Sequence, residues 1–130
     1  MRKKKSVLKM EVLTLILISV LLGVFGQLSM KRGMSIEGKI SLPELFSTRL
    51  FSIILNPYVF LGISLYVVAT GLWLVVLSTE ELSFAYPLIS LGYVFVAIFS
   101  KIFFDENITT FRMVGIVLIV LGTYFVASKL

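Results

Sequence analysis

The chain has 130 residues and a formal net charge of +5; 58% of the residues are hydrophobic and only 15% are charged. Soluble domains carry about 25% charged residues, so this composition, with a mean hydropathy of +1.06, excludes an ordinary water-soluble domain. The sequence has no Cys and no His, which excludes disulfides, thiolate nucleophiles and His-ligated metals. We therefore predict no enzyme activity, no metal, no cofactor and no nucleic-acid partner.

The apolar residues form four blocks, each long enough to cross about 30 Å of hydrocarbon as a helix. We predict a single all-α domain over residues 1–130, an integral membrane bundle with four transmembrane helices at about 11–30, 57–77, 83–104 and 111–128. A basic head precedes the first block, as in a secretory signal, but no small-x-small cleavage site follows, so we expect a retained helix. Asn56 and Pro57 fit the N-cap and the first position of the second helix, and Thr109 fits the cap of the fourth.

The connection between the first two helices is the longest. Within it, the spacing of residues 41–55 would place apolar side chains on one face of a helix and polar side chains on the other. The apolar face holds Leu42, Phe46, Leu50, Ile53 and Ile54, and the polar face holds Glu44, Thr48 and Ser52. This pattern predicts an amphipathic helix lying at the membrane interface. An ordered loop that covers the ends of the spans is the alternative.

Four spans place both ends of the chain on one side of the membrane. That side carries six basic residues (Arg2, Lys3, Lys4, Lys5, Lys9 and Lys129), and the other side also carries six (Lys31, Arg32, Lys39, Arg49, Lys101 and Arg112). The positive-inside rule is therefore nearly balanced, and the dense N-terminal cluster favours both ends in the cytoplasm. Insertion in both directions, with antiparallel pairing of two copies, is a second hypothesis that the balance allows.

Three segments carry a family resemblance: residues 26–31 (GQLSMK), 71–77 (GLWLVVL) and 82–91 (LSFAYPLISL). The chain resembles the small-multidrug-resistance-like branch of the drug/metabolite transporter (EamA-like) superfamily. Within that branch it is most similar to the small subunits of the aminoarabinose-phosphoundecaprenol flippase. The resemblance implies a multi-pass transporter of the cytoplasmic (inner) membrane of a prokaryote.

One position departs from the drug exporters of that branch. Members that resemble this chain carry a membrane-embedded Glu eight residues before the Lys that matches Lys31, and Gly23 stands there instead. An embedded carboxylate is what a cationic drug and protons would compete for, because its charge is costly in lipid. The acidic residues all fall at predicted helix ends or in loops: Glu11, Glu37, Glu44, Glu80, Glu81, Asp105 and Glu106. This arrangement argues against proton/drug antiport.

The first helix has a face of small and uncharged polar residues that ends in a basic one. Its members are Ser19, Gly23, Gly26, Gln27, Met30 and then Lys31. We predict a substrate groove here, with Gln27 as a hydrogen-bond partner and with Lys31 and Arg32 as charges for a phosphate. A close-packed seam of small residues, with Lys31 extending to the interface, is the alternative, and the glycines favour it.

The third helix carries a second polar stripe, made of Tyr86, Ser90, Tyr93, Ala97 and Lys101. We predict that Tyr86 and Ser90 bind substrate and that Lys101 either meets an anion or reaches water. Tyr93 is more typical of the interfacial aromatic belt, as is Trp73 on the second helix. Pro87 is expected to bend the helix slightly.

The predicted function follows from size as well as from motifs. Four helices are too few to hold both halves of an inverted repeat, so a dimer must supply the second half: a homodimer, which could be antiparallel, or a heterodimer with a related small subunit. Gly115 and Gly122 mark the predicted dimer face of the fourth helix. The leading hypothesis is a flippase subunit for a polyprenyl-monophosphate-linked sugar. The alternatives are a small-molecule or drug exporter and a non-transporting scaffold subunit of a glycosyltransferase system.

Overall fold

The computed structural model describes the backbone of residues 2–128 and the side chains of residues 10–128. Over this range the chain is helical, with α1 (Arg2–Glu37), α2 (Leu42–Leu45), α3 (Arg49–Leu55), α4 (Pro57–Thr79), α5 (Leu82–Leu88), α6 (Leu91–Phe104) and α7 (Thr110–Ala127). Four stretches are long and apolar enough to cross a membrane: Met10–Glu37, Pro57–Thr79, Leu82–Phe104 and Thr110–Ala127. The predicted all-α bundle of four spans is therefore confirmed. The side chains of the basic head and Lys129, which entered the charge count, lie outside the described residues.

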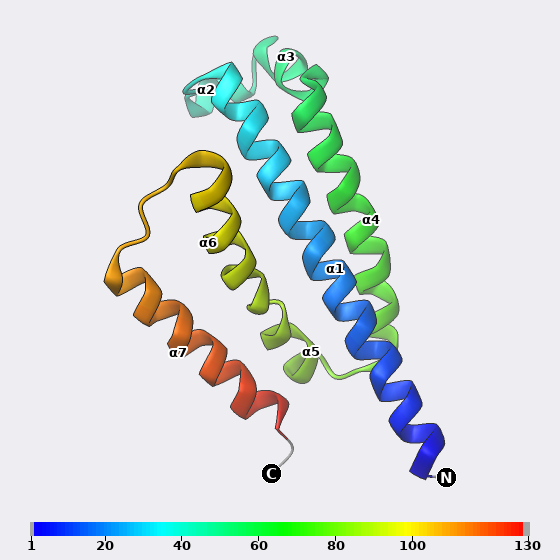
Figure 1. The fold of residues 1–130 in the computed structure, drawn as a ribbon. Coiled ribbons are helices and arrows are strands. Elements are labelled where there is room, and N and C mark those ends of the chain that lie inside the picture. The colour runs from blue at the N-terminus through cyan, green and yellow to red at the C-terminus, as the bar shows by residue number, and fades with distance from the viewer. Residues whose placement is uncertain (1, 129–130) are drawn as a thin grey trace.

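The helices are arranged around α1. In Figure 1, α4 runs along one side of α1, and α6 lies on its other side, with α7 beyond α6. The start of α1 and the end of α7 lie at one end of the molecule, and α2 and α3 lie at the other. A small core consists of buried residues from α1, the end of α4 and α5: Ile16, Val20, Val24, Val76, Ala85 and Leu88.

The interface between α1 and α4 is the most extensive in the bundle, and glycines make it close. A Cβ atom added to Gly62 would lie 2.5 Å from the carbonyl oxygen of Gly26, and one added to Gly26 would lie 2.9 Å from the carbonyl oxygen of Gly62. A Cβ atom added to Gly33, two turns further along α1, would lie 2.5 Å from the side-chain Cγ2 of Val59 and 3.0 Å from its backbone nitrogen. In lipid, helices associate through this kind of backbone approach and not through apolar burial. The alternative predicted for Gly26, a packed seam, is thus observed.

The first helix extends seven residues past its predicted end, from residue 30 to Glu37. Helix α1 passes through Lys31 and Arg32, whose long side chains can reach the polar interface while the backbone stays helical. It ends where Gly38 adopts a φ of +80°, a conformation that glycine reaches without steric cost. The caps predicted for the later helices are confirmed, since Asn56 accepts a hydrogen bond from the Tyr58 N–H and Thr109 accepts one from the Arg112 N–H.

The third span is broken, not slightly bent. Between α5 and α6 the backbone N–H groups of Ile89, Ser90 and Tyr93 donate to carbonyls three residues earlier, at 2.9–3.1 Å. The carbonyl of Pro87 accepts hydrogen bonds from the Ser90 N–H and from the Thr123 hydroxyl of α7. A side chain that enters the helical ladder next to a proline is a recognised cause of a kink. The prediction missed it because Thr123 is distant in the sequence.

The segment predicted at residues 41–55 is helical, but it forms two short helices, α2 and α3, separated by a turn, in place of one continuous helix. The segment caps the ends of α1 and α4: Arg49 donates to the Glu37 carbonyl, Asn56 donates to the Glu37 carboxylate, and Ile53 is buried. Two apolar side chains of its predicted face, Leu42 and Phe46, are 73% and 83% exposed. The segment thus covers helix ends, as the alternative held, and also presents apolar side chains outward.

Glu44 fixes the start of this segment. Hydrogen bonds from the Ser41 side chain and backbone and from Arg49 lower the pKa of Glu44 from 4.5 to about 2. Because the folded-state pKa is lower than the unfolded one, the ionised carboxylate stabilises the α2 turn above about pH 4.5, and this contribution is lost as the pH falls toward 2.

A carboxyl-carbon NMR titration should place the Glu44 midpoint near 2 and move it toward 4.5 in Ser41→Ala. A wild-type midpoint near 4.5 would contradict the capping geometry.

The glycine contact between α1 and α4 predicts an asymmetry between two glycines of α4. Gly62→Ala places a methyl against the Gly26 carbonyl and should lower the free energy of unfolding by about 1–3 kcal/mol. Gly71→Ala is the matched control, because no atom lies within 4 Å of an added Cβ there, and it should be neutral or stabilising by up to about 1 kcal/mol. Detergent-titration unfolding followed by circular dichroism measures both, and equal effects would refute the seam.

Candidate functional site: a neutral groove beside the first helix

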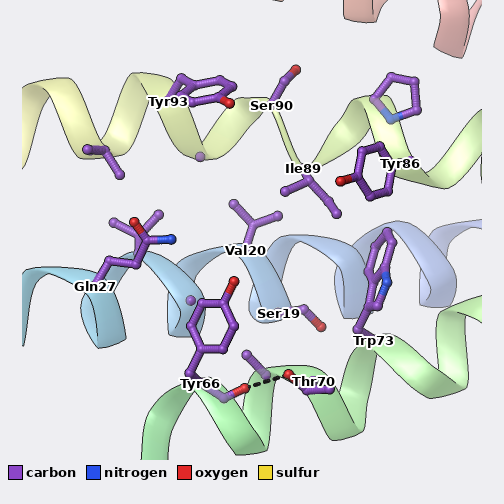
Figure 2. A pocket seen from close by; sticks show the side chains of 16 residues that line it. Ser19, Val20, Gln27, Tyr66, Thr70, Trp73, Tyr86, Ile89, Ser90 and Tyr93 are labelled. Atoms are coloured by element: carbon purple, nitrogen blue, oxygen red, sulfur yellow. Dashed lines mark hydrogen bonds between the residues drawn. The ribbon is translucent and has the colours of Figure 1, made fainter. Parts of the chain in front are cut away.

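A groove of about 560 Å³ lies between α1, α4 and the α5–α6 break (Figure 2). Eight polar or aromatic side chains line it: Ser19, Gln27, Tyr66, Thr70, Trp73, Tyr86, Ser90 and Tyr93. None of the described residues that line it carries a charge. The groove therefore offers hydrogen-bond donors and acceptors at the depth of the bilayer without the cost of a buried ion.

Five of the predicted substrate-binding and groove residues meet at this groove. Gln27 and Gly23 line it from α1, and Tyr86, Pro87 and Ser90 line it from the α5–α6 break. Figure 2 shows the Gln27 side chain directed from α1 toward the helix that carries Tyr93 and Ser90. The structure thus brings together the two polar faces from which a groove was predicted.

The wall contributed by α4 was missed. Tyr66, Thr70 and Trp73 line the groove, and Figure 2 shows Tyr66 and Trp73 rising from α4 toward α1. Trp73 was interpreted as an interfacial anchor, yet it lies beside Ser19 and Tyr86 in this site. The spacing of four and then three residues on one helix was the available signal, but these side chains were hidden among apolar neighbours of the same block.

The kink gives the groove its polar edge. Thr123 on α7 is buried and bonds both the Ser90 hydroxyl and the Pro87 carbonyl. Backbone groups freed at a helix break in lipid need such partners. Through these contacts α7 holds Tyr86 and Tyr93 on the groove side of the broken span.

The space at Gly23 is open. No atom lies within 4 Å of a Cβ added there, so the missing side chain at the position of the exporters' carboxylate leaves room in the groove. Gly26, by contrast, faces α4 and serves packing.

The three candidate phosphate-binding cations lie outside the groove. The Lys31 ammonium is 3.5 Å from the Glu106 carboxylate of the α6–α7 connection. Arg32 lines a different cleft, and Lys101 is exposed in the last turn of α6. The structure therefore places Gln27 in the groove and Lys31 one turn past it, about 6 Å along the helix axis.

The outer helix leaves a face free of contacts within the described chain. Only 6% of the 18-residue span Thr110–Ala127 is buried inside the structure. Gly115 and Gly122 both have open space at the position of a Cβ. An apolar helix with small residues on an open face is what a second membrane subunit could pack against.

Fold and groove define a small multi-pass membrane protein of the transporter class, and the family comparison gives the same class. Residues 4–128 match the EamA-like transporter family, and the chain belongs to that family. No solved structure matched it.

Curated relatives give a narrower similarity. The chain is 36% identical over 121 residues, 85% of its length and 87% of the relative, to the probable 4-amino-4-deoxy-L-arabinose-phosphoundecaprenol flippase subunit ArnF of Proteus mirabilis (strain HI4320). It is 38% identical over 128 residues, 90% of the chain and 88% of the relative, to the subunit of the same name from Shewanella sediminis (strain HAW-EB3). A shorter match of 51 residues, 39% of the chain and 48% of the relative, is 39% identical to the subunit ArnE of Enterobacter sp. (strain 638).

Proposed function

We propose that the chain is a flippase subunit that moves a polyprenyl-monophosphate-linked sugar across the cytoplasmic membrane of a prokaryote. The observation that carries the proposal is the neutral groove, lined by tyrosines, a tryptophan, hydroxyls and the Gln27 amide. A sugar presents hydroxyls and apolar ring faces, and such side chains supply hydrogen bonds together with flat apolar area. The names of the ArnF relatives, which refer to a sugar lipid of this kind, support the same conclusion.

In the proposed pathway the sugar crosses through the groove while the polyprenyl tail stays in the lipid. Gln27, Tyr86 and Ser90 would replace part of the water that the sugar loses. Lys31 would receive the phosphate at the end of the groove, because among the described residues its ammonium pairs with Glu106 alone, in an exposed ion pair that contributes little. The phosphate would thus compete with Glu106 for the same cation. Lys101, exposed in the last turn of α6, remains a candidate for the phosphate before or after passage.

The direction of transport depends on the charge of the head group. An anionic head group moving outward gains about 2.3 kcal/mol per charge per 100 mV of inside-negative potential. An amino sugar carries a positive charge that cancels this gain, so its net movement would require consumption of the lipid on the far side. Neither case requires a proton-exchanging carboxylate in the groove.

We propose that a second small subunit completes the pathway. One copy supplies four spans, and the open face of α7 at Gly115 and Gly122 suits a helix partner. The separate similarities to ArnF and ArnE support a heterodimer of two related small subunits. A homodimer, parallel or antiparallel, is the alternative arrangement.

A drug exporter of the small-multidrug-resistance type is the second candidate function. It shares the family and the four spans, but a cationic drug needs a counter-charge in the membrane. Where such an exporter would carry that counter-charge, this groove has Gly23 and open space. A non-transporting scaffold is the third candidate, and it would need the α7 face but not Gln27 or Lys31.

The proposal predicts the outcome of a liposome assay with an undecaprenyl-monophosphate sugar, with the related small subunit added where the chain alone is inactive. Lys31→Ala should slow flipping about tenfold and Gln27→Ala about fivefold, because hydrogen bonds to charged and to neutral groups are worth about 1.5–3 and 0.5–1.5 kcal/mol. Lys39→Ala, a cation of the loop outside the groove, is the control and should leave the rate unchanged.

The same assay separates the alternatives. Uptake of a quaternary ammonium drug without lipid movement would support the exporter. The scaffold predicts a different pattern in the activity of the associated glycosyltransferase system. That activity would survive Gln27→Ala and Lys31→Ala but would be lost when Gly115 and Gly122 are replaced by leucine.

A further inference from the structure

A second cleft, of about 720 Å³, lies between α1, α4 and the end of α6. Its wall is apolar, with Leu22 and Phe25 on α1, Leu61 and Leu65 on α4, and Phe103 on α6. Arg32 is the one charged side chain among the described residues that line it. The cleft therefore combines a hydrocarbon surface with a single cation.

This cleft is separate from the groove. The two share no lining residue. On α1 the groove is lined by Val20, Gly23 and Gln27, and the cleft by Phe25 and Arg32. At about 100° per residue these two sets point to opposite sides of the helix. A head group held in the groove would therefore have α1 between itself and Arg32.

Arg32 makes no ion pair among the described residues, as is also true of Lys39 and Lys101, but of these three cations it alone lines the cleft. Lys31 pairs with Glu106 and Arg49 pairs with Glu44. Arg32 makes no ion pair and no side-chain hydrogen bond with any described residue. It lies near the end of α1 that carries the short helices α2 and α3 (Figure 1), so its guanidinium is available to an anion at head-group level.

We propose that this cleft holds a resident anionic phospholipid of the bilayer, with one acyl chain against the apolar wall and the phosphate on Arg32. A guanidinium binds a phosphate through two parallel hydrogen bonds, and the wall supplies the apolar area that a lipid chain needs. A resident lipid is favoured over the transported one because the cleft and the groove do not connect. The inference does not depend on the proposed function.

The test is native mass spectrometry of the full chain in detergent, with phosphatidylglycerol and phosphatidylcholine as probes. Wild type should retain phosphatidylglycerol in preference to phosphatidylcholine, and Arg32→Gln should weaken phosphatidylglycerol binding about fivefold with no change for phosphatidylcholine. Lys39→Gln removes a nearby loop cation that lines neither cavity and should have no effect. Equal losses of phosphatidylglycerol binding in Arg32→Gln and Lys39→Gln would mean a diffuse charge effect and would overturn the proposed site.

A second pair of variants tests the hydrocarbon wall independently. Leu61→Trp fills the cleft and should reduce retention of phosphatidylglycerol, whereas Phe60→Trp, on the adjacent exposed position outside the cleft, should not. Retention unchanged in both Leu61→Trp and Arg32→Gln would refute the proposal. Undecaprenyl phosphate that displaces phosphatidylglycerol at equimolar concentration would overturn the assignment to a resident phospholipid.

Discussion

The contact between the backbones of Gly26 and Gly62 sets the geometry on which the rest of the bundle depends. Because each glycine leaves no room for a Cβ on the other, α1 and α4 lie close and their relative rotation is fixed. That rotation points Gln27 on α1 and Tyr66 on α4 into one groove, and it turns Phe25 and Arg32 toward the opposite cleft. In lipid, where apolar burial gives no net attraction between helices, close approach of this kind is the main source of association. The site is thus a consequence of packing as much as of polar residues.

The broken third span makes a second contribution, and it shows how a membrane protein accommodates polar backbone. An unsatisfied carbonyl costs several kcal/mol in hydrocarbon. The Pro87 carbonyl accepts from the Ser90 N–H, and the Thr123 hydroxyl of α7, which also lies 2.9 Å from its own Ile119 carbonyl, is a second partner at 3.2 Å. The same threonine binds the Ser90 side chain, so one residue attaches the outer helix and shapes the groove wall. Stability and site geometry are coupled at this point.

Much of this arrangement could be predicted from the sequence, for physical reasons that also explain the errors. Hydrophobic length fixes the number of spans, and local chemistry fixes the caps at Asn56 and Thr109. Gln27, Gly23, Tyr86 and Ser90 were found because a polar or small residue stands out in an apolar block. Contacts between distant segments carry no such local signal: the role of Thr123, the pairing of Lys31 with Glu106, and the α4 wall with Tyr66 all depend on tertiary packing. The separation of the cations from the groove escaped prediction for the same reason.

The central claim is that the neutral groove binds the sugar of a polyprenyl-phosphate lipid, and Trp73 can report on it directly. Trp73 is the single tryptophan of the chain and lines the groove, so its fluorescence senses occupancy without a label. We expect a saturable change in Trp73 emission on titration with a polyprenyl-monophosphate sugar, weakened in Gln27→Ala, and no saturable change with a quaternary ammonium cation. A saturable response to the cation alone, with none to the sugar lipid, would contradict the account.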